Sequence, residues 1–102
     1  MINVIATIKV KPGTRAKFLS IVAANVPNVR AEKGCLSYVP AVDVESGIPV
    51  QVGVRPDVVT IVEAWESLPD LQAHLKAPHM LAYREKVKDI VKNVSLHVLA
   101  PA

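Results

Sequence analysis

The chain has a single cysteine, Cys35, among its 102 residues. One thiol excludes an internal disulfide and offers no paired-thiol spacing for zinc. The histidines add no metal motif, because His74 and His79 are five residues apart with Pro78 between them, and not one helical turn apart. We therefore expect no metal site and a reducing, cytoplasmic compartment.

Long apolar runs and runs of like charge are also missing. Apolar residues make up 51% of the chain, but no run approaches the roughly 20 residues that span a bilayer, and the N-terminus lacks the layout of a signal peptide. The 12 Lys and Arg against 9 Asp and Glu give a net charge of +3, spread thinly. These features predict a soluble protein of one domain, residues 1–102, with no nucleic-acid or membrane partner.

Aromatic residues are scarce, at 4% of the chain. Most of the side chains that could take part in chemistry lie in one stretch. The stretch Val58–Val91 holds the only tryptophan, two of the three histidines and one of the two tyrosines. Alternation predicts a strand over 58–66 in which Glu63 shares a face with Ile61 and Trp65. A carboxylate on an apolar face is costly to bury alone, so Glu63 either meets a basic partner or borders a wet cavity. We expect any chemistry to lie in this stretch.

A helix is predicted to follow that strand. Ser67 is a suitable N-cap, so the helix should start at Leu68, with His74 on its apolar side. Pro78 cannot continue the hydrogen-bond ladder, and a kink or restart is expected there, with His79 in the new first turn. The buried stripe of the second segment is expected to contain Met80, Tyr83, Val87 and Ile90.

The residues before Val58 are predicted to form a strand, a helix and a second strand. Apolar residues alternate over 2–11, and a Pro-Gly turn follows. Thr14 is the expected N-cap of a helix that continues to about Ala31, although Pro27 should disturb its last turns. A glycine then provides a left-handed stop, and 35–44 is predicted as the second strand.

Two regions complete the order of elements. The segment 45–57 is interrupted by two glycines and two prolines, so we predict a long connection with at most a ragged edge strand. A last strand is predicted over 94–99. The order strand, helix, strand, strand, helix, strand is that of the ferredoxin-like α+β fold, a four-stranded antiparallel sheet with both helices on one face. Because the strands are apolar on both faces, a second copy is expected to cover the bare face in a homodimer.

The chain combines a strand-borne Glu-x-Trp, a helical Leu-x-x-His-Leu and a Pro-His pair in a fixed order. With their neighbours, the residues of this set are Glu32, Gly34, Cys35, Leu36, Tyr38, Glu63, Trp65, Glu66, Ser67, Leu71, His74, Leu75, Pro78 and His79. This set closely resembles the antibiotic biosynthesis monooxygenase family of dimeric α+β barrels, over nearly the whole chain. The resemblance implies the fold and the dimer.

The resemblance also implies a choice among activities. The family includes cofactor-free monooxygenases that oxidise quinols and polycyclic phenols with molecular oxygen, isomerases of small phosphorylated ketones, and haem-degrading members. Haem-degrading members look to require an asparagine on the first strand and a tryptophan and a histidine on the second helix, where this chain has Ala6, His74 and Arg84. The resemblance therefore favours a monooxygenase with no cofactor. An isomerase of a small ketone and a non-catalytic ligand-binding module on the same scaffold are the alternatives.

A cofactor-free oxygenase needs a dry apolar pocket, a base that draws the phenol towards phenolate, and a polar group that stabilises the anion. We expect His74 to be the base and Arg84 or His79 to stabilise negative charge. An isomerase would use Glu63 or His74 to move protons next to a carbonyl. The expected lining of the pocket is Trp65, Tyr38, Met80 and Tyr83.

Each of these residues also has a structural interpretation. His74 lies between leucines and is equally compatible with a hydrogen-bonded core histidine. Glu63 fits a structural ion pair, for example with Arg84. Trp65 and Tyr38 fit the core or a dimer interface. The sequence leaves both sets of interpretations open.

Overall fold

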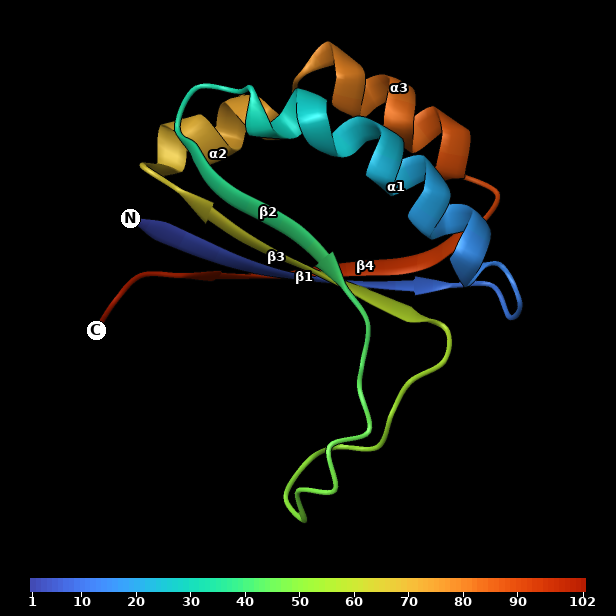
Figure 1. Ribbon diagram of the computed structural model, residues 1–102. Helices are drawn as coiled ribbons and strands as arrows, with labels where there is room; N and C mark the ends of the chain where they lie inside the picture. Colours follow the sequence, from blue (N-terminus) through green and yellow to red (C-terminus); the bar gives the residue numbers. More distant parts are fainter.

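The computed structural model describes residues 1–102 and contains four strands and three helices (Figure 1). The two halves of the chain each supply two strands, and the second helix of the predicted order is divided into two segments. The elements are, in chain order, β1 (Ile2–Val10), α1 (Arg15–Arg30), β2 (Cys35–Ala41), β3 (Val58–Trp65), α2 (Leu68–Leu75), α3 (Pro78–Val87) and β4 (Val91–Leu99).

The four strands form one antiparallel sheet in the order β2-β3-β1-β4. The three helices lie over one face of this sheet, and the other face has no helix against it (Figure 1). In the β1–β3 register Val4 pairs with Glu63 and Ala6 with Ile61, so these side chains share the helix-covered face. This arrangement confirms the ferredoxin-like α+β prediction.

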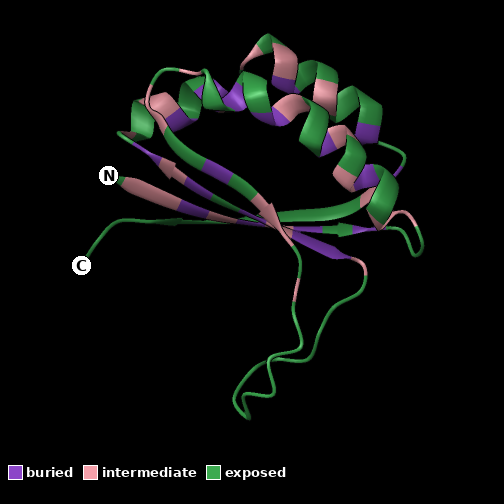
Figure 2. Cartoon of the chain, in the orientation of Figure 1, coloured by how far each residue is buried: buried purple, intermediate pink, exposed green.

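The core lies between the sheet and the helices (Figure 2). The even-numbered residues of β1 from Val4 to Val10 are buried, and so are Val59, Ile61 and Trp65 of β3. One stripe of α1 covers these strand residues. Each fully buried aliphatic or Phe side chain contributes roughly 1.5–3 kcal/mol to the free energy of folding, relative to an exposed one. The buried residues of this stripe are Phe18, Val22, Val26 and Val29.

The second helical region follows the prediction closely. Ser67 caps α2, accepting a hydrogen bond from the Asp70 backbone N–H at 3.3 Å while its hydroxyl donates to the Asp70 carboxylate at 2.9 Å. The helix ends at Leu75, and α3 restarts with Pro78 in its first turn, where a missing N–H costs no helical bond. No helix of the chain has the length and apolar character needed to cross a bilayer.

Five details of the predicted elements differ from the structure. Strand β2 ends at Ala41 and not at residue 44, and β4 begins three residues earlier than expected, at Val91. The alternation of the second strand places Leu36 on the same face as the buried Tyr38, but Leu36 is exposed because the β2–β3 register shifts between Cys35 and Ser37. Helix α1 ends at Arg30, as expected within one residue, but Pro27 does not interrupt its last turns. The Thr14 hydroxyl donates to the Lys11 carbonyl instead of capping the helix.

The connection between β2 and β3, residues 42–57 and here called the arm, extends away from the helices beyond the bare face of the sheet (Figure 1). It contains no strand. Its base is held by a two-point ion pair in which the Arg55 guanidinium donates to the Asp43 carboxylate at 2.8 and 3.0 Å. This pair holds the pKa of Asp43 well below its usual range, at about 2. The arm therefore has a defined shape without a core of its own.

Gly34 fixes the turn between α1 and β2 against the start of α2. Its φ is +80°, and a Cβ at this position would overlap the Asp70 side chain. The Gly34 carbonyl accepts a hydrogen bond from the Glu66 N–H at 2.8 Å. These contacts bring the turn, which carries Glu32, to the beginning of α2.

A pair of glycine substitutions separates the two constraints at Gly34. Gly13 has the same φ of +80° but open space around its Cβ position. We expect Gly13→Ala to lower the free energy of unfolding by about 1–2 kcal/mol through backbone strain alone, and Gly34→Ala to lower it by a further 1–3 kcal/mol or so because the side chain also collides with Asp70. Urea unfolding measures both values, and equal losses would contradict the close packing at Gly34.

Candidate functional site

A cavity of about 420 Å³ lies between the helix-covered face of the sheet and helices α2 and α3. Eleven of its 15 lining residues are hydrophobic, which is the composition of a pocket for an apolar small molecule. Val94 and Leu96 of the edge strand β4 line the cavity but stay half-exposed, so it opens along that edge. The lining residues are Ala6, Ile8, Tyr38, Ile61, Glu63, His74, Leu75, Met80, Tyr83, Arg84, Val87, Lys88, Val91, Val94 and Leu96.

Glu63 is the carboxyl group of this cavity. The alternation of side chains along β3 places Glu63 on the helix-covered face of the sheet, where it is only 5% exposed. The Trp65 indole N–H donates to its Oε1 at 3.0 Å. Burial raises the pKa of Glu63 to about 7, the nearby Glu32 charge adds to the rise, and the Trp65 bond opposes it. Glu63 can therefore hold or release a proton near neutral pH.

His74 lines the same cavity and is only 2% exposed. Its ring is 4.7 Å from the Trp65 ring and meets the Tyr38 ring edge-on at 5.7 Å. Its Nδ1 lies 2.7 Å from Glu32 Oε2. Burial lowers the pKa of His74, and the Glu32 hydrogen bond and charge oppose this effect. The imidazole is thus mostly neutral at pH 7 and can act as a base.

The remaining polar groups of the cavity are two phenols and two cations. Burial raises the pKa of Tyr38 beyond its ordinary range and that of Tyr83 to about 12, so both keep their protons. Lys88 forms an ion pair with Glu85. Arg84 borders the cavity, is exposed and has no acidic partner, so its charge is available to an anion at the mouth.

The structure brings together most, but not all, of the predicted site residues. His74, Glu63 and Arg84 line the cavity, as do Tyr38, Met80 and Tyr83. Trp65 does not: it is completely buried, because its indole packs under the His74 ring and supports Glu63. The structure also shows no ion pair between Glu63 and Arg84.

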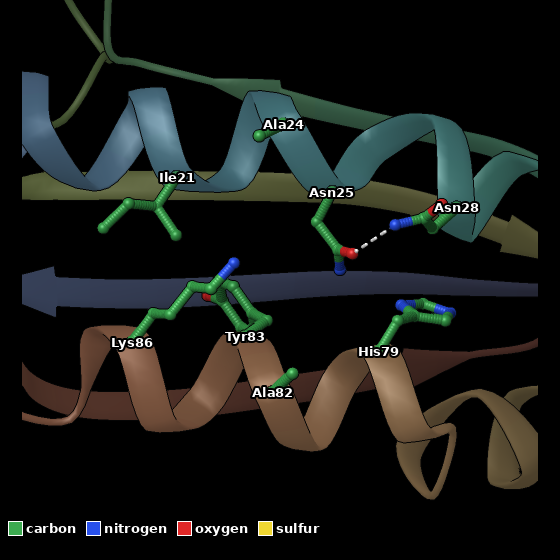
Figure 3. Close-up of a pocket in the computed structure, with 8 residues that line it drawn as sticks. All are labelled: Ile21, Ala24, Asn25, Asn28, His79, Ala82, Tyr83 and Lys86. Carbon is green, nitrogen blue, oxygen red and sulfur yellow. Dashed lines mark hydrogen bonds between the residues drawn. The ribbon is translucent and has the colours of Figure 1, made fainter.

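His79 lies outside the large cavity. It borders a separate cavity of about 140 Å³ between α1 and α3, where it faces Asn25 and Asn28 across the gap (Figure 3). Its Nε2 is 3.3 Å from Glu32 Oε2, and neither ring nitrogen has a well-directed hydrogen bond. The helix break at Pro78 turns His79 towards α1 and Glu32 and away from the large cavity, so His79 does not join the other predicted site residues there.

Glu32 is the site residue that the sequence argument missed. It was recognised only as part of the family resemblance, although its carboxylate contacts both histidines. It precedes His74 by 42 residues, and no local pattern connects a turn after α1 with a face of α2. No group of three or more His, Cys, Asp or Glu side chains is placed to hold a metal ion.

Together these groups allow one type of chemistry. A neutral imidazole, a carboxyl group that titrates near pH 7 and an unpaired guanidinium surround an apolar space. A base can remove a proton from a bound molecule there, and a cation can stabilise the anion that results. The arrangement suits acid–base chemistry on a small, largely apolar molecule.

Known proteins resemble this chain in both sequence and fold. Residues 1–86 match the family described as antibiotic biosynthesis monooxygenase. The protein named "Probable quinol monooxygenase YgiN" from Escherichia coli K12 is 42% identical over 103 residues, which cover 99% of this chain and 98% of that protein.

Solved structures share the fold across the whole chain. PA3566 from Pseudomonas aeruginosa has a TM-score of 0.81 at 25% identity, and the match covers 99% of this chain and 93% of the PA3566 chain. Rv0793 from Mycobacterium tuberculosis has a TM-score of 0.80 at 27% identity, and the match covers 99% of this chain and 94% of the Rv0793 chain. The chain therefore belongs to the antibiotic biosynthesis monooxygenase family.

Proposed function

We propose that the protein is a cofactor-independent monooxygenase that oxidises a quinol-like or phenolic small molecule. The observation that carries the proposal is that a neutral His74 and a Glu63 carboxyl group with a pKa raised to about 7 line the same apolar cavity. The name of the 42%-identical relative, a quinol monooxygenase, supports the same substrate class. The lone Cys35 agrees with a reducing, cytoplasmic location.

The cavity limits the size of the substrate. Water occupies about 30 Å³ per molecule in the liquid, so 420 Å³ corresponds to about 14 water molecules, or about 14 non-hydrogen atoms at one per water. This is the size of a quinol with two fused rings, and the open flank along β4 leaves room for a substituent. A phosphorylated ketone is a poorer match, because Arg84 is the only lining cation without an acidic partner.

The proposed reaction starts with deprotonation. The substrate O–H bond breaks, its proton moves to His74 Nε2, and the electron pair stays on the phenolate oxygen, near the charge of Arg84. The electron-rich phenolate then reduces molecular oxygen. One oxygen atom enters the ring and the other leaves as water, with the quinol supplying the electrons and hydrogen atoms. Glu63 can hold the proton that the oxygen adduct needs.

Oxygen consumption by the purified, metal-free protein with a panel of quinols and hydroxylated polycyclic phenols tests this activity. We expect uptake with no added cofactor and a loss of about 10²- to 10⁴-fold in His74→Ala. Gln72→Ala is the control, because Gln72 is exposed on the same helix as His74 and lines neither cavity, so it should leave the rate unchanged. No uptake above the uncatalysed rate across the panel would favour an isomerase or a binding module instead.

The Glu63 carboxyl group also predicts a pH dependence of stability. Its folded pKa of about 7 lies above the ordinary value of 4.5, so between these pH values the folded protein holds a proton that the unfolded chain has released. The free energy of unfolding should therefore fall as pH rises from 5 to 8, by about 2–3 kcal/mol from this group.

Comparison with Glu63→Gln isolates this effect. The amide cannot titrate, and the opposite contribution of His74, whose pKa is lowered, is present in both proteins. Urea unfolding at both pH values should show that the variant gains stability relative to the wild type as pH rises. A constant difference between the two proteins would show that Glu63 is ionised throughout.

We propose further that the protein is a homodimer in which the bare sheet face and the arm contact a second copy. Val39 and Val62 lie on that face and are half-exposed. The arm is exposed except at Asp43 and Asp57 near its two ends (Figure 2), and Val50 and Val52 are 91% and 83% exposed. Two apolar surfaces on the same side of one chain can meet in a two-fold pair, which buries both.

Sedimentation velocity tests the role of the arm. Val50 and Val52 touch little within one chain, so Val50→Asp with Val52→Asp should leave monomer folding intact and raise the dimer dissociation constant about tenfold or more. Leu81→Asp, an exposed site on α3, is the control and should not weaken the dimer. A monomeric wild type at micromolar concentration would contradict the proposed assembly.

A further inference from the structure

One carboxylate oxygen of Glu32 lies close to both His74 and His79. Its Oε2 lies 2.7 Å from His74 Nδ1 and 3.3 Å from His79 Nε2. The three side chains come from the turn after α1, from α2 and from α3. The Glu32 side chain is 17% exposed, so this carboxylate connects the buried imidazole with the surface.

The contact determines which nitrogen of His74 carries the proton. An ionised carboxylate only accepts hydrogen bonds, so a neutral His74 must carry its proton on Nδ1. His74 Nε2 makes no hydrogen bond within the protein, and the residue lines the large cavity. The lone pair on Nε2 is then the one available to a molecule bound there.

His79 lies against the same carboxylate oxygen. The two imidazole rings are 6.5 Å apart and inclined at 50°, with Glu32 Oε2 within reach of both. Both His79 ring nitrogens are buried without a well-directed hydrogen bond. Glu32 is therefore the acidic group available to His79, and a position close to both rings is favoured over rotation into solvent.

We infer that Glu32 is a positioning residue that fixes His74 in the tautomer with a free Nε2 and stabilises the imidazolium formed when a substrate proton reaches that nitrogen. The inference rests on the proposed function for its catalytic part. The step conserves charge and atoms: one substrate O–H bond breaks, one N–H bond forms at Nε2, and the Nδ1 proton stays in the hydrogen bond to Glu32. No oxidant takes part in it.

Nuclear magnetic resonance of nitrogen-15-labelled full-length protein tests the positioning without relying on turnover. We expect neutral His74 to carry its proton on Nδ1 in the wild type. Glu32→Gln removes the negative charge and should lower the pKa of His74, since the Glu32 bond and charge both raise it. Glu66→Gln is the matched control, because Glu66 is exposed and has no contact with either histidine.

Other titratable and charged groups around His74 must be followed in the same titration. They come from β2, β3 and α3 and are Tyr38, Glu63, His79 and Arg84. A wild-type proton on Nε2, or a His74 titration that Glu32→Gln leaves in place, would overturn the inference even if the enzyme proves active.

The pH profile of oxygen uptake adds the catalytic part. Glu32→Gln should lower kcat/KM about tenfold or more and move the acid limb of the profile to lower pH, because the base is weaker. A purely structural role for Glu32 would lower the rate at every pH without moving the limb, and that result would contradict the inference. If the wild type oxidises no quinol, the proposed function fails while the resonance data still decide the tautomer.

Discussion

The burial of one carboxyl group organises the site. Glu63 lies on the helix-covered face of β3, where desolvation makes its ionised form costly. The protein reduces this cost with a bond from the Trp65 indole, and the indole in turn supports the His74 ring. A raised pKa at Glu63 and a lowered one at His74 follow from the same dry surroundings. Acid and base are thus created by position rather than by unusual residues.

Much of this arrangement can be predicted from the sequence because it depends on local periodicity. Alternation along 58–66 places Glu63 and Trp65 on one face, and the cap at Ser67 and the break at Pro78 determine where the helices begin. Local patterns could not find Glu32, since its link to His74 depends on how a distant turn packs against α2. They also left open whether Trp65 lines the pocket or belongs to the core, because alternation gives the face of a strand but not the depth of a side chain within the core.

The arm shows the same division between local and long-range information. Its glycines and prolines predict a connection, which the structure confirms, but they do not show that Asp43 and Arg55 close its base. Ordering a residue costs about 1–2 kcal/mol, and the arm buries little apolar surface within its own chain to offset that cost. This imbalance is the physical reason to expect a partner surface against it.

The proline break between α2 and α3 is what allows two histidines to share one carboxylate. In a continuous helix, residues five apart differ in direction by about 140°, so His74 and His79 would face opposite sides. The break at Pro78 changes the direction of the chain, and both rings then reach Glu32. The five-residue spacing of these histidines argues against a metal site along one helix. Because the helix restarts at Pro78, the same spacing places an acidic group within reach of both imidazoles and leaves His74 Nε2 free.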